Sequence, residues 1–134
     1  MSYLIAYVAT FAVFLIADFI GLSYLIKPIF QRTIGHLMLE NFRVLPAFLF
    51  YAFLVLVIMW FVSWPALNEG HSLIWVFGSA ALLGAAAYGT YEFTNYALLR
   101  DWTLQLVVVD LTWGTLLTGT SAMAGVAITR AVVG

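Results

Sequence analysis

Three acidic residues stand inside long apolar stretches of this sequence, where a carboxylate is costly. They are Asp18, Glu92 and Asp110, and each has mostly apolar and aromatic neighbours. A charged side chain at the centre of a membrane costs about 3 kcal/mol or more, so such residues face the protein interior and pair there. The chemistry they support is cation binding, proton transfer or polar pairing between helices.

The three acids lie at one depth relative to the ends of their apolar stretches. Each stands eight or nine residues from a charged residue at the same edge: Lys27 for Asp18, Arg100 for Glu92 and Asp101 for Asp110. At 1.5 Å per helical residue, this spacing places all three about 12 Å below that edge. Tyr51 stands at a similar distance from Arg43. Four apolar stretches therefore bring a polar group into one layer.

Aromatic and amide side chains accompany the acids on the same helical faces. Tyr88, Glu92 and Asn95 follow the i, i+4, i+7 spacing of one face. Asp110 and Trp113 are three residues apart and share a face in the same way. We expect one internal ligand-binding site made of Asp18, Tyr51, Tyr88, Tyr91, Glu92, Asn95, Asp110 and Trp113.

This layer suits a cation, a proton, or a small or lipid ligand. Carboxylate and amide oxygens favour magnesium, manganese or calcium over zinc or copper, which makes Asp18, Glu92 and Asp110 the candidate metal ligands. An organic cation would also bind favourably against the tyrosine rings and the Trp113 indole. Binding or transport of such a ligand is the function that the residues favour.

Two alternatives stay open from the residues alone. A membrane-embedded enzyme could act on a lipid that enters laterally, with one carboxyl as general acid and another as base. The sequence carries no recognisable nucleophile or cofactor motif in support of this. The layer could instead be a structural polar core of an interaction or scaffold protein, since polar contacts join membrane helices at about 0.6 kcal/mol each. Three acids exceed what that role needs.

The composition indicates a membrane protein. Of 134 residues, 65% are hydrophobic and 8% are charged, far outside the range of soluble domains. The net charge of −1 and the scattered basic residues exclude a nucleic-acid footprint. The absence of cysteine excludes disulfides and cysteine-bound metal. We expect an all-α, polytopic membrane protein with a single transmembrane domain over residues 1–134.

Four apolar runs are long enough to cross about 30 Å of hydrocarbon as helices. We expect an antiparallel bundle with spans at about residues 3–26, 45–64, 73–99 and 103–129. Pro28 and Pro65 should end the first and second spans, because proline disfavours helix at the preceding residue. Pro46 falls in a first turn, where a missing N–H costs little. Ser72 is the expected N-cap of the third span.

The segment between the first two spans, about residues 28–43, is expected to form an interfacial amphipathic helix. Ile29 and Ile34 belong to an apolar face, with Arg32 and His36 on the opposite face. Such a helix would cover one end of the bundle. Trp102 is expected in the aromatic belt at the same end.

Charge placement predicts the orientation of the bundle. Four of the five basic residues, Lys27, Arg32, Arg43 and Arg100, lie at the first and third connections, whereas Arg130 lies at the other end. The positive-inside rule places those connections in the cytoplasm and both termini outside. His36 and His71 would then lie on opposite sides of the membrane, so we expect no haem ligated by the pair.

Small residues should determine how the third and fourth spans pack, since lipid gives helices no hydrophobic reason to associate. Ala80 and Gly84 form a stripe in the third span, and Gly114 and Thr118 form one in the fourth. We expect a tight antiparallel pair. A bundle of four helices is thin for a pore, so transport would call for a homo-oligomer.

The run from Tyr88 to Asn95 (YGTYEFTN), Trp102, and the run VDLTWG at residues 109–114 resemble a bacterial family of predicted small membrane proteins, domain-of-unknown-function family 2177. The resemblance extends over nearly the whole chain, including Asp18, Phe50-Tyr51 and Pro65-Ala66. It implies a four-span bacterial membrane protein and carries no reaction or substrate with it. We expect this protein in the bacterial inner membrane. Glu92 stands where Asp is expected, and the longer side chain weakens the case for strict metal geometry. Thr103 stands where Pro is expected.

Overall fold

The computed structural model describes residues 2–41 and 43–133, and within this part the chain contains helices and no strands. The first long helix comprises α1 (Ser2–Gly21), a π-helical turn (Leu22–Ile26), α2 (Lys27–Ile34) and a 3-10 turn (Gly35–Leu37). The second comprises α3 (Val44–Ile58), a π-helical turn (Met59–Ser63) and α4 (Trp64–Glu69). The third is α5 (Leu73–Leu98) and the fourth is α6 (Leu104–Val133).

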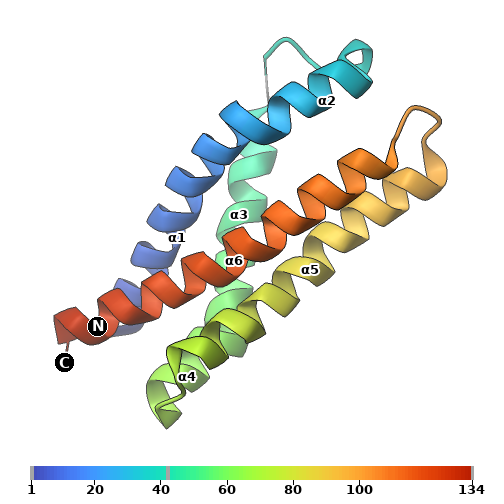
Figure 1. Cartoon of the computed structure of the whole chain (residues 1–134). Coiled ribbons are helices and arrows are strands. Elements are labelled where there is room, and N and C mark those ends of the chain that lie inside the picture. Colours follow the sequence, from blue (N-terminus) through green and yellow to red (C-terminus); the bar gives the residue numbers. More distant parts are fainter. Residues whose placement is uncertain (1, 42, 134) are drawn as a thin grey trace.

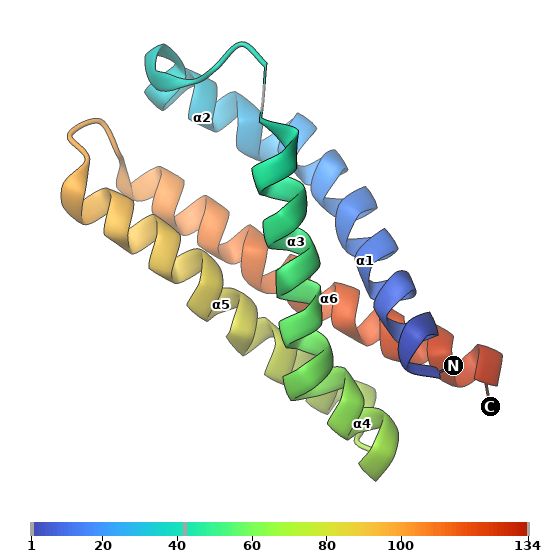
Figure 2. The ribbon, with the colours of Figure 1, turned by 180° about the vertical axis from the view of Figure 1, so that it is seen from behind.

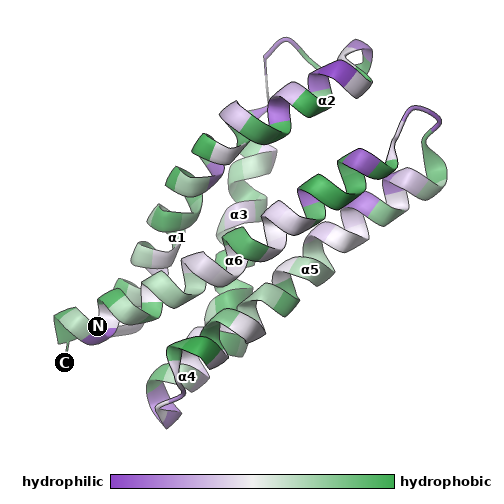
Figure 3. Ribbon diagram, viewed as in Figure 1, coloured by the Kyte–Doolittle hydropathy of each residue, from purple (hydrophilic) through white to green (hydrophobic). Residues whose placement is uncertain are grey.

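These four helices are each long and apolar enough to cross a membrane, which confirms the predicted fold class. Both termini lie at one end of the bundle, and α2 and the α5–α6 connection lie at the other (Figure 1). Hydrophilic residues gather at the two ends, and further polar patches mark α5 and α6 near the loop that joins them (Figure 3). Many large apolar side chains of the spans are exposed, as expected for helices surrounded by lipid.

The helix α6 is the central element of the bundle. In its most apolar window 44% of the residues are buried, against 22–28% in the other three spans. It runs antiparallel to α5 along most of its length and crosses α1 on another side (Figures 1 and 2). Residues on α6 can therefore meet partners from several helices at once.

Glycines allow this close packing, as the sequence predicted. A Cβ atom at Gly84 would lie 2.6 Å from the Cβ atom of Thr118 and 2.8 Å from the Gly114 carbonyl oxygen. A Cβ atom at Gly114 would overlap the ring of Tyr88. The expected tight pair of α5 and α6 is confirmed. Gly125, farther along α6, instead faces Thr10 of α1.

The prediction that Pro28 and Pro65 end the first two spans is wrong, because both helices continue through the prolines. Each proline follows a π-helical turn, in which hydrogen bonds join residues five apart: Lys27 N–H to the Leu22 carbonyl, and Trp64 N–H to the Met59 carbonyl. A proline ring clashes with the carbonyl four residues earlier, and in both helices that carbonyl lies inside the wider turn. The local change of helix type accommodates the ring.

The expected separate interfacial helix over residues 28–43 is also wrong in its bounds. Its helical part is the continuation of the first span and ends at Leu37, while Met38 is extended. Phe42 lies outside the described residues. Ile29 and Ile34 are buried against Trp102, Leu106 and Val107 at the start of α6. The apolar face therefore packs on protein and covers this end of the bundle.

Polar contacts fix the connections at the two ends. The Ser72 hydroxyl accepts a hydrogen bond of 3.1 Å from the Trp75 N–H, which confirms Ser72 as the N-cap of α5. Arg130 donates to the carbonyls of Ala66 and His71 and so joins the end of α6 to the α4–α5 connection. At the opposite end, His36 and Asp101 form a contact of 2.8 Å.

Candidate functional site

A cavity of about 570 Å³ lies among all four spans at the depth of the acidic layer. Its polar lining includes Asp18 from α1, Tyr51 from α3, Tyr88 and Tyr91 from α5, and Asp110 from α6. Most of the remaining wall is apolar or aromatic: Leu22, Ile26, Phe30, Met38, Ala47, Phe50 and Ala87. Lys27 and Thr90 complete the lining. A few polar groups in an apolar wall are typical of a pocket for a small molecule.

The cavity is open to the outside of the bundle between α3 and α5. Ala47 and Phe50 on one side, and Thr90 and Tyr91 on the other, are exposed lining residues, and Lys27 at the start of α2 is exposed as well. The second long helix packs on α5 through its Met59–Ser63 turn, and the part of α3 nearer Val44 stands away from α5 (Figure 2). The opening therefore faces laterally, where the lipid phase lies around a spanning bundle.

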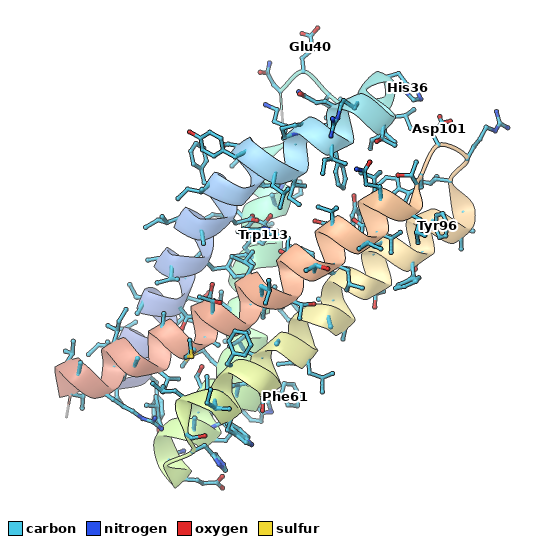
Figure 4. All side chains as sticks on the ribbon, in the orientation of Figure 1. His36, Glu40, Phe61, Tyr96, Asp101 and Trp113 are labelled. Atoms are coloured by element: carbon cyan, nitrogen blue, oxygen red, sulfur yellow. The ribbon has the colours of Figure 1, made fainter. Side chains whose placement is uncertain are left out.

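The carboxylate of Asp18 is buried and held by two aromatic partners. The Trp113 indole N–H donates a hydrogen bond of 3.3 Å to it. The Tyr51 hydroxyl is also in hydrogen-bonding contact with it. Trp113 projects from α6 into the middle of the bundle (Figure 4), where its ring occupies the space that a Cβ atom at Gly21 would need. Gly21 thus lets the indole reach Asp18.

Glu92 is entirely buried, with 0% of its surface exposed. Its Oε1 atom accepts a hydrogen bond of 2.9 Å from the Trp102 indole. Its Oε2 atom has no hydrogen-bond donor among the described residues. The carboxyl of Asp110 lies within hydrogen-bonding contact of Glu92, and two carboxylates offer each other only acceptors unless one carries a proton.

Asp110 connects the two parts of the acidic layer. Its carboxyl lines the cavity together with Asp18 and also contacts Glu92, which does not line the cavity. The arrangement is a cavity with Asp18 at one wall, Asp110 at another, and a buried carboxyl behind Asp110. The carboxylates of Asp18 and Asp110 can neutralise a cation in the cavity, and Asp110 can exchange a proton with a ligand there.

The structure brings predicted residues from all four spans to one cavity, but not all eight of them line it. Five of the eight line the cavity, whereas Glu92, Asn95 and Trp113 do not. Asn95 contacts Tyr91, and Trp113 supports Asp18 from behind. Within residues 2–41 and 43–133, no three His, Cys, Asp or Glu side chains lie close enough to hold a metal ion. The expected metal set of Asp18, Glu92 and Asp110 is therefore not assembled among these residues, and two of its carboxyls are instead hydrogen-bonded to indoles, Asp18 to Trp113 and Glu92 to Trp102.

Sequence reasoning missed Trp102 as a site residue. The sequence predicts it for the aromatic belt, but it is buried and its indole N–H donates to Glu92, with edge-to-face contacts to Phe30 and Tyr91. The available signal was its place directly before α6, in a turn tight enough to bring it back over α5. From the sequence alone, a tryptophan in the interfacial aromatic belt cannot be distinguished from a buried tryptophan that donates a hydrogen bond.

Lys27 was also missed as a cavity residue, and the reason is geometric. In a regular α-helix, residues nine apart point about 180° away from each other, which would place Lys27 opposite Asp18. The π-helical turn Leu22–Ile26 inserts one residue between them, which reduces the angle to about 80°. Lys27 therefore reaches the same cavity as Asp18.

Neither histidine lines this cavity, and the partners of the two histidines lie near opposite ends of α5. His36 pairs with Asp101 in the α5–α6 connection, where both are exposed (Figure 4). His71 contacts Glu69 and stacks on Trp75 at the start of α5. Neither lines the cavity or contacts its acids.

Comparison with known proteins identifies the family of this chain. Residues 3–127 match the family described as predicted membrane protein (DUF2177). No curated protein and no solved structure gives a match. Since the matched region covers most of each of the four spans and contains every residue of the site just described, the chain belongs to this family of predicted membrane proteins.

Proposed function

We propose that the chain binds an amphipathic molecule from the lipid phase and that this molecule carries a cationic group. The observation that carries the proposal is the laterally open cavity of about 570 Å³, lined by two buried acids within a mostly apolar wall. Neither a bare metal ion nor a fully apolar lipid would use both parts of this lining.

The charge and aromatic content of the cavity favour a cationic head group. The lining contains two carboxyls, Asp18 and Asp110, against one ammonium, Lys27. Three tyrosine rings and Phe50 complete a surface of the kind that attracts ammonium groups through their π faces. The apolar part of the ligand would lie along Phe50 and Ala87 toward the opening.

We further propose that the protein resides in a bacterial inner membrane with the cavity in its cytoplasmic half. The support is the basic bias, with Lys27, Arg32, Arg43 and Arg100 at the end formed by α2 and the α5–α6 connection. Both termini would then be periplasmic.

Cysteine labelling in intact cells tests this orientation. The chain has no cysteine of its own, so single cysteines at Ser2 and Arg100 can be probed with a membrane-impermeant reagent. We expect labelling at position 2 and none at position 100 until the cells are opened. The reverse pattern would show that the termini are cytoplasmic.

Binding of decyltrimethylammonium tests the ligand class. Saturable binding to the protein in nanodiscs, with empty nanodiscs subtracted, should exceed binding of decyl sulfate and decanol, which share its chain but not its charge. Asp18→Asn should weaken binding at least about tenfold, because losing about 1.4 kcal/mol of Coulombic attraction between the ammonium and a partly desolvated carboxylate already changes the affinity tenfold.

Neighbouring alanines provide the matched control for the cavity. Ala87 lines it, whereas Ala86 is exposed on the lipid-facing side of α5. Ala87→Leu should reduce the number of sites or their affinity, and Ala86→Leu should leave both unchanged. Equal binding of the three probes, or equal effects of the two alanine variants, would leave the acids as a structural core and refute the proposal.

A further inference from the structure

The strongest unexplained feature of the molecule is the buried oxygen of Glu92. Its side chain is entirely inaccessible, and its Oε2 atom has no donor among the described residues although Oε1 is bonded to Trp102. Buried polar atoms are nearly always satisfied in native proteins. A buried acceptor inside a membrane bundle therefore needs a hydrogen-bond donor, and the positions of the non-hydrogen atoms do not show which group donates.

The neighbouring group identifies that partner. The Asp110 carboxyl is in hydrogen-bonding contact with Glu92, and a carboxyl can donate only when it is protonated. One proton between the two would satisfy the orphan oxygen and remove one of two like charges from the hydrocarbon layer. A second proton is not needed, because Asp110 also faces the cavity and its polar lining.

We infer that Glu92 and Asp110 hold one shared proton, and that this proton is released through the cavity when a cationic group binds beside Asp110. The second half of this inference rests on the proposed function. The exchange balances in charge: one cation enters, the O–H bond of the carboxyl pair breaks, and its proton passes to a buffer base in the surrounding water. No oxidant, reductant or other reactant takes part.

The groups around the pair fit such an exchange. Asp18 on α1 and Lys27 on α2 face the same cavity as Asp110. Tyr51 on α3 and Tyr88 and Tyr91 on α5 also line it. Trp102 covers Glu92 from the end of the bundle and holds its other oxygen. The side of the pair toward the cavity is therefore the route by which its proton meets a ligand.

Infrared spectroscopy of the full chain in detergent tests the shared proton without any ligand. At neutral pH the wild-type protein should show the C=O band of a protonated carboxyl, shifted in heavy water. Glu92→Gln and Asp110→Asn should both lose it, because the introduced amide N–H takes the place of the proton. Asp18→Asn should retain it. A band that survives in Glu92→Gln, or that disappears only in Asp18→Asn, would overturn the shared proton.

Proton release on binding tests the coupling. Decyltrimethylammonium has no proton of its own, so a pH-sensitive dye in weak buffer should report release from wild-type protein and none from Glu92→Gln, which should still bind the probe. Binding to wild-type protein without release would overturn the coupling while leaving the proposed function intact. Absence of binding would refute the proposed function and with it the coupling, whereas the infrared result would still decide the shared proton.

Discussion

Trp102→Ala should cost the protein a few kcal/mol of stability, the largest loss expected for any single substitution in the bundle. Trp102 is buried in the cluster that contains Ile29, Ile34, Leu106 and Val107. Removing a buried tryptophan from a packed core costs about 3–5 kcal/mol in soluble proteins, and the lower end applies where lipid supplies no hydrophobic driving force. Thermal unfolding in detergent measures the loss.

Two further variants separate packing from hydrogen bonding at this position. Trp102→Phe keeps most of the ring but removes the indole N–H from Glu92, and an unsatisfied buried acceptor costs about 1–3 kcal/mol. Trp60→Ala is the matched control, because Trp60 is 63% exposed on the lipid-facing surface. If Trp60→Ala and Trp102→Ala lower the unfolding temperature equally, Trp102 is a belt residue after all.

Gly84→Leu should be the next most damaging change, because it forces α5 away from α6. Even a Cβ atom there would come within 2.6 Å of Thr118 and 2.8 Å of the Gly114 carbonyl oxygen, and backbone cannot yield as a side chain can. Overpacking of this kind costs about 1–3 kcal/mol and at times more. The measurement is again thermal unfolding, together with monodispersity in size-exclusion chromatography.

Gly78 supplies the control on the same helix. A Cβ atom at Gly78 would meet nothing within 4 Å, so Gly78→Leu should be neutral or slightly stabilising, since glycine costs a helix about 0.5–1 kcal/mol relative to alanine. Equal losses for the two variants would mean that helix propensity or lipid contact, and not the α5–α6 interface, dominates at both positions.

The membrane setting makes the acidic layer more informative than it would be in a soluble core. In water, a polar residue on a helix needs no partner, whereas in lipid each of Asp18, Glu92 and Asp110 had to turn inward. That constraint explains why depth along the chain was sufficient to predict that polar groups from four spans share a level. Depth does not determine which of these side chains contact each other, because it gives their position along the membrane normal and not within the membrane plane.

The amino-acid sequence by itself determined the four spans, their antiparallel order, the Ser72 cap and the small-residue contact of α5 with α6. These follow from length, hydropathy and local residue types, which act within one helix or between neighbours in the chain. Pattern rules failed at Pro28 and Pro65, because a proline predicts a break only when the helix cannot change its local geometry. Both helices change it through a π-helical turn.

Only the tertiary structure decided which of the three acids line the cavity and which is buried outside it. The rotation introduced by the Leu22–Ile26 turn brings Lys27 into the cavity with Asp18, and the α5–α6 connection folds Trp102 over Glu92. Asp110 lines the cavity together with Asp18 and also contacts Glu92, because it lies on α6, the central helix, which packs against both α1 and α5. Such placements depend on helix rotation and crossing, and small cumulative changes along a helix set both quantities. The sequence therefore predicts the layer, and the packing of the helices divides it into an open cavity, which Asp110 lines, and a buried carboxyl, Glu92, in contact with Asp110.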